Sequence, residues 1–174
     1  LIIRHFTKKQ QLKSKGIKCL SLIFIDKVAN YMGENPIIKD LFIKKYKEIY
    51  PEFHTNQEPT TQHINELQGY YFAKTGKGEY TDSETTMNSN KEIYDAILKD
   101  RQGLLSFGEE TANKIEFIFS HSALGVGWDN PNIFNIVTLS NSYSEIKKRQ
   151  EIGRGLRICV NQKGERVYDK ENTS

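Results

Sequence analysis

Two arginines near the end of the chain have the spacing of a phosphate-binding helix face. Residues 150–157 read Gln-Glu-Ile-Gly-Arg-Gly-Leu-Arg, and the preceding residues 143–149 indicate that this stretch is helical. At about 100° per residue, Gln150, Arg154 and Arg157 fall on one stripe at positions i, i+4 and i+7. Guanidinium groups offer fixed donors that match phosphate oxygens, and they keep their charge. This face therefore predicts a phosphate contact.

Two glycines inside the same stretch strengthen that interpretation. Gly153 and Gly155 each cost roughly 0.5 to 1 kcal/mol relative to alanine in a helix interior, and such violations of local rules tend to mark functional sites. The alternative is a solvated basic helix that makes ordinary ion pairs with neighbouring glutamates. For an isolated pattern this alternative is the more frequent one, so the choice depends on the surrounding sequence.

A second stretch, residues 120–131, has the composition of a ligand-binding loop. It follows an apolar segment that reads as a buried strand, and loops after strand ends are where α/β sheets bind ligands. Gly125 and Gly127 allow a tight turn, while Ser122 and Asp129 offer a hydroxyl and a carboxylate. A purely structural turn around a buried tryptophan explains the same composition.

Strands and helices alternate around these stretches. Short apolar runs rich in Ile, Phe, Leu and Val read as parallel strands covered on both faces. They span residues 19–25, 115–119, 133–139 and, more weakly, 69–73. Helical spacing is expected over residues 4–15, over 26–50 with a break at 33–36, and over 90–101. This order predicts an α/β fold with a parallel sheet flanked by helices, and Asp26 is placed to cap the helix after the first strand.

Composition fits one soluble domain. The chain has 174 residues, 37% of them hydrophobic, and no apolar run approaches the roughly 18 to 20 residues of a membrane span. The net charge of +3 permits contact with a polyanion without identifying one. Cys19 and Cys159 lie in apolar stretches without metal-ligand spacing, which favours buried thiols in the cytoplasm, and no signal peptide is expected. Surface or structural roles are expected for the four scattered histidines, His5, His54, His63 and His121.

Together the two stretches resemble motifs V and VI of superfamily 2 helicases and translocases. Residues 150–157 keep the Gln-x-x-Gly-Arg-x-x-Arg form without departure. More narrowly, motif V at 120–131, motif VI and a motif IV region at 20–31 resemble the Res (restriction and translocation) subunit of type III restriction enzymes. The resemblance spans nearly the whole chain, residues 1–174, as one RecA-like, P-loop NTPase-like helicase C-terminal lobe. Gly125-Val126 departs from the family pattern, in which a bulkier and often charged pair is expected.

The resemblance implies a two-lobed motor in which ATP lies in the cleft between RecA-like lobes and DNA lies across both. Arg154 and Arg157 would reach the γ-phosphate as finger arginines, with Gln150 ordering that face. The remaining implied contacts are Gly127, Asp129 and Gly153 with the nucleotide, and Ser122 and Gly125 with DNA. The implied cofactors are ATP and Mg²⁺. The implied partners are DNA, the first lobe of the same protein and the methylation subunit.

The sequence lacks the groups of the other half of such a site. There is no GxxxxGK[ST] loop, because Tyr71 stands where the first glycine belongs and Gly78 replaces the Ser or Thr that holds magnesium. No strand ends in an Asp-Glu box. We therefore predict that the isolated chain does not hydrolyse ATP. The segment 145–147, Glu-Ile-Lys, matches part of a nuclease signature, but no paired acid precedes it, so we interpret the match as chance.

Two other interpretations stay open. The chain could be a lobe of another superfamily 2 DNA remodeller that shares motifs V and VI. It could instead be a non-enzymatic interaction module that docks the methylation subunit through residues 75–89. That polar stretch is expected to be a mobile surface loop.

Overall fold

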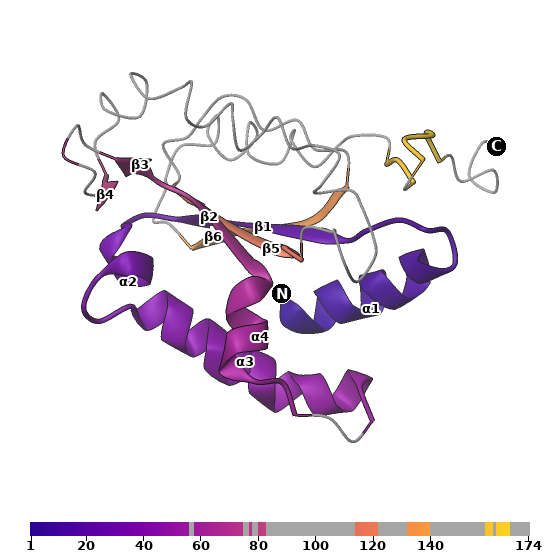
Figure 1. Ribbon diagram of the computed structural model, residues 1–174, viewed down its shortest axis with the longest axis horizontal. Coiled ribbons are helices and arrows are strands. Elements are labelled where there is room, and N and C mark those ends of the chain that lie inside the picture. Colours follow the sequence, from indigo (N-terminus) through magenta and orange to yellow (C-terminus); the bar gives the residue numbers. More distant parts are fainter. Residues whose placement is uncertain are drawn as a thin grey trace.

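A parallel sheet with helices on one face forms the described part of the molecule (Figure 1). The computed structural model describes residues 1–55, 58–74, 77, 80–82, 114–121, 132–139, 159–161 and 163–167. Within these ranges a four-stranded sheet has the order β2-β5-β1-β6, and β3 and β4 form a separate pair. The expected α/β fold is confirmed, and the arrangement is consistent with a RecA-like lobe.

The two central strands are wholly buried. β1 covers Leu20–Ile25 and β5 covers Phe117–His121, and every residue of both is buried. β2, Gln68–Tyr71, pairs with β5, and β6, Ile133–Leu139, pairs with β1. All three pairings are parallel. A parallel strand covered on both faces needs no polar alternation, which explains why β1 reads as a nearly continuous apolar run, interrupted only by Ser21.

Helices α1, α3 and α4 lie on the same face of the sheet (Figure 1). The helices are α1, Ile2–Lys13; α2, Ala29–Met32; α3, Ile37–Phe53; and α4, Thr61–Glu66. α3 buries Phe42, Tyr46 and Tyr50, which recur every fourth residue and so share one face. The break expected at 33–36 is confirmed, because it separates α2 from α3.

Aromatic rings fill the space between the helices and the sheet. The ring centroid of Phe6 in α1 lies 5.3 Å from that of Tyr46 in α3. The centroid of Phe42 lies 4.9 Å from that of Phe117 in β5. Such aromatic pairs contribute about 0.5 to 1.5 kcal/mol each beyond the burial of their area. These contacts hold α1 and α3 against the centre of the sheet.

Two expected element boundaries are wrong by about two residues. The first helix is Ile2–Lys13 rather than 4–15, because the chain turns after it and Gly16 adopts a φ of 64°. β5 begins at Phe117 rather than 115. The N–H groups of Glu116 and Phe117 both donate to the carbonyl of Leu67, at 2.9 and 3.0 Å, which interrupts the regular ladder there.

Two local features differ from the sequence expectation. α4 was not expected, since six residues are too few to show a helical period, yet Thr60 Oγ1 caps it by accepting from the N–H of His63 at 3.1 Å. The prediction that Asp26 caps the next helix is wrong. The N-cap of α2 is Val28, whose N–H donates to Asp82 Oδ1 at 2.7 Å.

The weaker strand candidate at 69–73 divides into two elements. β2 ends at Tyr71, and β3, Ala73–Lys74, pairs antiparallel with β4, Tyr80–Thr81. β4 lies inside the stretch 75–89. The rest of that stretch, except Lys77 and Asp82, lies outside the described residues, as does the helix expected at 90–101. The mobility of 75–89 stays a prediction.

The described ranges contain neither a membrane-spanning helix nor a cluster of metal ligands. No helix in these ranges is both long and apolar enough to cross a lipid bilayer. Among the same residues, no group of three His, Cys, Asp or Glu side chains is arranged to hold a metal ion.

Candidate functional site at the carboxyl edge of the sheet

Three neighbouring strands end at the same level of the sheet. Ile25, the last residue of β1, is in register with His121 at the end of β5 and with Leu139 at the end of β6. Because the strands are parallel, the segments that follow them start side by side at one edge. The stretch 120–131 starts here with Ser120 and His121, at the edge where α/β sheets bind ligands.

A hydrogen bond joins the ends of β1 and β5. His121 Nε2 lies 2.8 Å from the carbonyl oxygen of Asp26. Because a carbonyl oxygen only accepts, Nε2 carries the proton and donates it. The His121 residue is only 6% exposed. This contact fixes the residue that precedes Ser122 relative to the end of β1.

Asp82 lies against the same edge. Its Oδ1 accepts from the N–H of Val28 at 2.7 Å and lies 3.5 Å from Nε2 of His121. Asp26 Oδ1 accepts from Asn30 Nδ2 at 3.4 Å. The Asp82 side chain is 47% exposed, so its attraction to a protonated His121 is screened by water and contributes little to stability. These contacts connect the residue after β4 to the end of β1 and to β5.

The residues expected to contact phosphate and DNA lie outside the described residues. They are Ser122, Gly125, Gly127, Asp129, Gln150, Gly153, Arg154 and Arg157. The last described residues before them are His121 for the first stretch and Leu139 for the second, and both lie at the carboxyl edge. The roles of these eight residues stay predictions.

A buried polar network that the sequence analysis missed joins α1 to three strands. His5 Nδ1 lies 2.8 Å from Ser21 Oγ, and His5 Nε2 lies 3.0 Å from Glu116 Oε2. Lys9 Nζ donates to the other carboxylate oxygen of Glu116. Asn135 Nδ2 of β6 donates to Ser21 Oγ at 3.1 Å. The network lies near the amino ends of the strands, opposite the edge that carries His121.

Burial sets the charges in this network. Burial lowers the pKa of His5 and outweighs the opposing effect of Glu116, so the ring is neutral at pH 7. Burial also acts to raise the pKa of Glu116, but the hydrogen bond from His5 and the charge of Lys9 outweigh it and hold that pKa at about 2. With Nε2 donating to the carboxylate, Nδ1 of the neutral ring accepts from the Ser21 hydroxyl.

The network has the order Ser-His-Glu found in hydrolases, but it does not fit that chemistry. Ser21 and His5 are both 0% exposed, whereas a nucleophile must reach its substrate. We therefore interpret the network as structural. One feature of the sequence could have predicted this network. His5 lies beside Phe6 on the apolar side of α1, and a buried polar group needs a hydrogen-bond partner.

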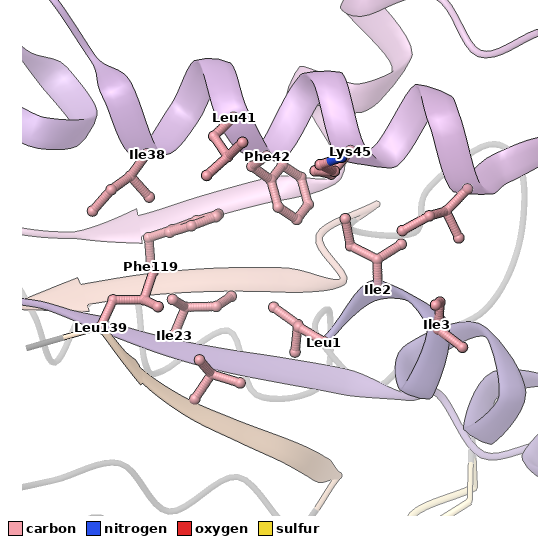
Figure 2. A pocket seen from close by; sticks show the side chains of 12 residues that line it. Leu1, Ile2, Ile3, Ile23, Ile38, Leu41, Phe42, Lys45, Phe119 and Leu139 are labelled. Atoms are coloured by element: carbon pink, nitrogen blue, oxygen red, sulfur yellow. The ribbon is translucent and has the colours of Figure 1, made fainter.

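An apolar groove lies between α1, α3 and the sheet, as Figure 2 shows. It has a volume of about 300 Å³. Its lining residues are Leu1, Ile2, Ile3, Ile23, Ile38, Leu41, Phe42, Lys45, Ile49, Phe119, Val137 and Leu139. Of these lining residues, Lys45 alone has a charged side chain. Phosphate binding needs several converging donors, so this groove does not fit a nucleoside triphosphate.

Comparison with known proteins supports the expected family. No family model matches the chain. It is 35% identical over 183 residues to the Type III restriction-modification enzyme EcoP15I Res subunit of Escherichia coli, with 97% of this chain and 18% of the relative covered. It is 36% identical over 186 residues to the EcoPI Res subunit of Escherichia phage P1, with 99% and 18% covered. It is 33% identical over 177 residues to the StyLTI Res subunit of Salmonella typhimurium, with 89% and 17% covered.

The expected resemblance to the Res subunit of type III restriction enzymes is confirmed by these matches. The chain spans less than a fifth of the length of the curated relatives that it matches.

Proposed function

We propose that this chain is the second RecA-like lobe of an ATP-dependent, DNA-translocating Res subunit of a type III restriction enzyme. The observation that carries the proposal is the similarity to three Res subunits over 89 to 99% of the chain. The fold agrees with it, because β1, β5 and β6 end together at one edge. Such an edge is where α/β sheets bind nucleotides.

In this proposal the lobe supplies finger arginines to an ATP site shared with the first lobe. Arg154 and Arg157 stabilise the charge that develops on the γ-phosphate, and Gln150 and Gly153 shape that face of the helix. An arginine finger contributes roughly 10³ to 10⁵ in rate, or roughly 4 to 7 kcal/mol of transition-state stabilisation. Gly127 and Asp129 lie near the nucleotide, while Ser122 and Gly125 contact the DNA backbone.

The first lobe of the longer protein completes the site. It supplies the phosphate-binding loop and the ligands of Mg²⁺, which this sequence lacks. We therefore propose that the chain hydrolyses ATP only within the full-length, cytoplasmic enzyme, together with DNA and the methylation subunit. The endonuclease activity of that enzyme is assigned to residues outside this chain.

DNA-stimulated phosphate release by the full-length protein tests the proposal. Malachite-green assays compare the wild type with Arg154→Ala and Arg157→Ala. We expect each substitution to lower kcat by about 10³ or more, with little change in DNA retention on filters. Arg4→Ala, which removes an exposed arginine on α1, is the matched control and should behave as wild type. Equal turnover in Arg154→Ala and the wild type would contradict the finger assignment.

A second assay measures the isolated chain. We expect no ATP turnover above the buffer rate, because nothing in its sequence cradles the β-phosphate. Turnover at the rate of the intact motor, lost in Arg154→Ala, would show that the chain carries a complete site.

A further inference from the structure

A separate pocket lies between α1 and the end of α3. It has a volume of about 250 Å³, and its lining residues are Phe6, Lys9, Gln10, Lys13, Phe53 and His54. Lys9 bonds to Glu116, which directly precedes β5. The pocket therefore lies toward the amino ends of the strands, away from the edge at His121. Sites for drug-sized ligands span roughly 300 to 1,000 Å³, so this pocket encloses about one ring system and leaves the rest of a larger ligand at its rim.

Aromatic rings form the walls of the pocket. The centroids of Phe6 and Phe53 lie 5.0 Å apart with an angle of 33° between the rings. His54 meets Phe6 edge to face at 5.2 Å and stacks on Tyr50 at 3.9 Å. Phe53 and His54 are half-buried, so part of each residue is open to a ligand. Planar bases stack on such rings with little dependence on base identity.

Polar groups complete the lining. Lys13 is exposed in the last turn of α1. Lys9 donates to Glu116, and an ammonium group has three hydrogens to donate. The amide of Gln10 offers both a donor and an acceptor, as the edge of a base requires. None of the six lining residues is acidic. The pocket thus combines stacking surfaces, an amide and two cations.

The charge around α1 is positive even after opposing terms are counted. Six lysines and arginines precede Asp26, the first acidic residue of the chain. Glu116 next to the pocket and Glu52, the exposed residue before Phe53, contribute one negative charge each. The C-terminal ends of α1 and α3 contribute roughly half a charge each. The balance favours an anionic group on the ligand.

We propose that this pocket binds a nucleoside phosphate, either free or as one nucleotide of a single strand. The base packs against Phe53 and His54, Gln10 contacts its edge, and the phosphate lies at Lys13 and Lys9. This inference does not rest on the proposed ATP site, because it concerns a different pocket and needs none of the residues 120–131 or 150–157.

Photocrosslinking of a nucleotide to the full-length protein tests the proposed pocket. One arm uses 5-iododeoxyuridine 5′-monophosphate, and the other uses a short oligothymidylate that contains one 5-iododeoxyuridine. After irradiation, mass spectrometry of proteolytic peptides locates the adduct. We expect it in the peptide that contains Phe53 and His54, and we expect the non-iodinated counterpart to suppress it. An adduct in the first arm identifies a free nucleotide as the source, and one in the second identifies a strand.

Matched variants make the result specific. Lys13→Glu should lower the adduct yield by about tenfold, because it replaces a charge-assisted contact with a repulsive charge. Phe53→Leu keeps apolar bulk but removes the ring, and it should lower the yield as well. Lys44→Glu removes an exposed lysine of α3 that does not line the pocket, and it should leave the yield unchanged. Thermal melting checks folding, and Lys13→Glu decides the outcome if Phe53→Leu does not fold.

Two results would overturn the proposal. One is the absence of an adduct on this peptide in both arms. The other is an equal yield in the wild type and Lys13→Glu. Arg154→Ala should leave the adduct intact while abolishing ATP turnover, so failure of one proposal is distinguishable from failure of the other.

Discussion

His121 donates a hydrogen bond from Nε2 to the carbonyl oxygen of Asp26 at 2.8 Å, and so ties the ends of the two central strands. The donor is the last residue of β5, and Ser122, the first residue proposed to contact nucleotide or DNA, follows it directly. The contact thus positions the start of that stretch relative to β1. Its removal is expected to affect both stability and activity.

We predict that His121→Ala lowers the free energy of unfolding by about 0.5 to 1.5 kcal/mol, because the half-buried Asp26 carbonyl loses its donor. His121→Gln retains a side-chain N–H with similar reach and should recover most of that loss. Urea denaturation of both variants measures the difference. In the full-length protein, DNA-stimulated ATP turnover should follow the same order. Equal losses in the two variants would exclude this hydrogen bond as the cause.

Acid should destabilise the fold in two stages. The pKa of His5 is lowered by burial from its ordinary value of 6.5, so as pH falls below 6.5 the unfolded state binds the proton first and stability is lost. The pKa of Glu116 is about 2 rather than 4.5, so the stability it contributes above pH 4.5 is lost as pH falls toward 2. Both effects have the same sign. Urea midpoints measured from neutral to acid pH should decline in both ranges.

Glu116→Gln is the control for the acid prediction. It removes the group that titrates between pH 4.5 and 2, so the decline in stability over that range should become shallower than in the wild type. Parallel wild-type and variant curves below pH 4.5 would show that another group causes the loss.

Substitution of two adjacent residues of α3 should change the free energy of unfolding by very different amounts. Leu41 is 54% exposed at the apolar groove, whereas Phe42 is 7% exposed and belongs to the core. Leu41→Glu is therefore expected to change the free energy of unfolding by no more than about 0.5 kcal/mol. Phe42→Ala should cost about 3 to 5 kcal/mol, because it leaves a cavity among packed rings. A large loss in Leu41→Glu would show that the groove is filled in solution.

The two thiols should differ in reactivity. Burial, reinforced by the charge of Glu116, raises the pKa of Cys19 to about 12, and this residue is 1% exposed. Cys159 is half-buried. Because the thiolate is the reactive form, Ellman's reagent should label Cys159 first in the native protein and both thiols in denaturant. The faster phase should disappear in Cys159→Ser. Its disappearance in Cys19→Ser instead would contradict the burial of Cys19.

The strands were predictable because each reads as a short apolar run, although β6 is fully buried only at Ile133. The run 133–139 was expected with the bounds that β6 has, and the run 19–25 differs from β1 by one residue. The pairing between them was not predicted, because an apolar run does not specify the strand beside it. α4 was not predictable from an apolar period, since Thr60 starts it and six residues complete it.

The buried network was hidden for a different reason. His5 and Glu116 lie 111 positions apart. The residues around each of them form no pattern from which the other could be predicted as its hydrogen-bond partner. The proposed nucleotide site rests on the motifs that contain Arg154 and Arg157, which lie outside the described residues. The structure adds the place at which the stretch 120–131 starts, with Ser120 and His121 beside the end of β1.

The strand order has a consequence for biosynthesis. β1 is flanked by β5 and β6, and its register with β5 begins at Ser21 and Phe117. On the ribosome, the six residues of β1, five of them apolar, emerge long before either neighbour exists. At roughly 5 to 20 residues per second, the interval until Phe117 is added lasts roughly 5 to 20 seconds. During that time the nascent chain presents an unpaired, aggregation-prone segment, which is a natural target for a chaperone.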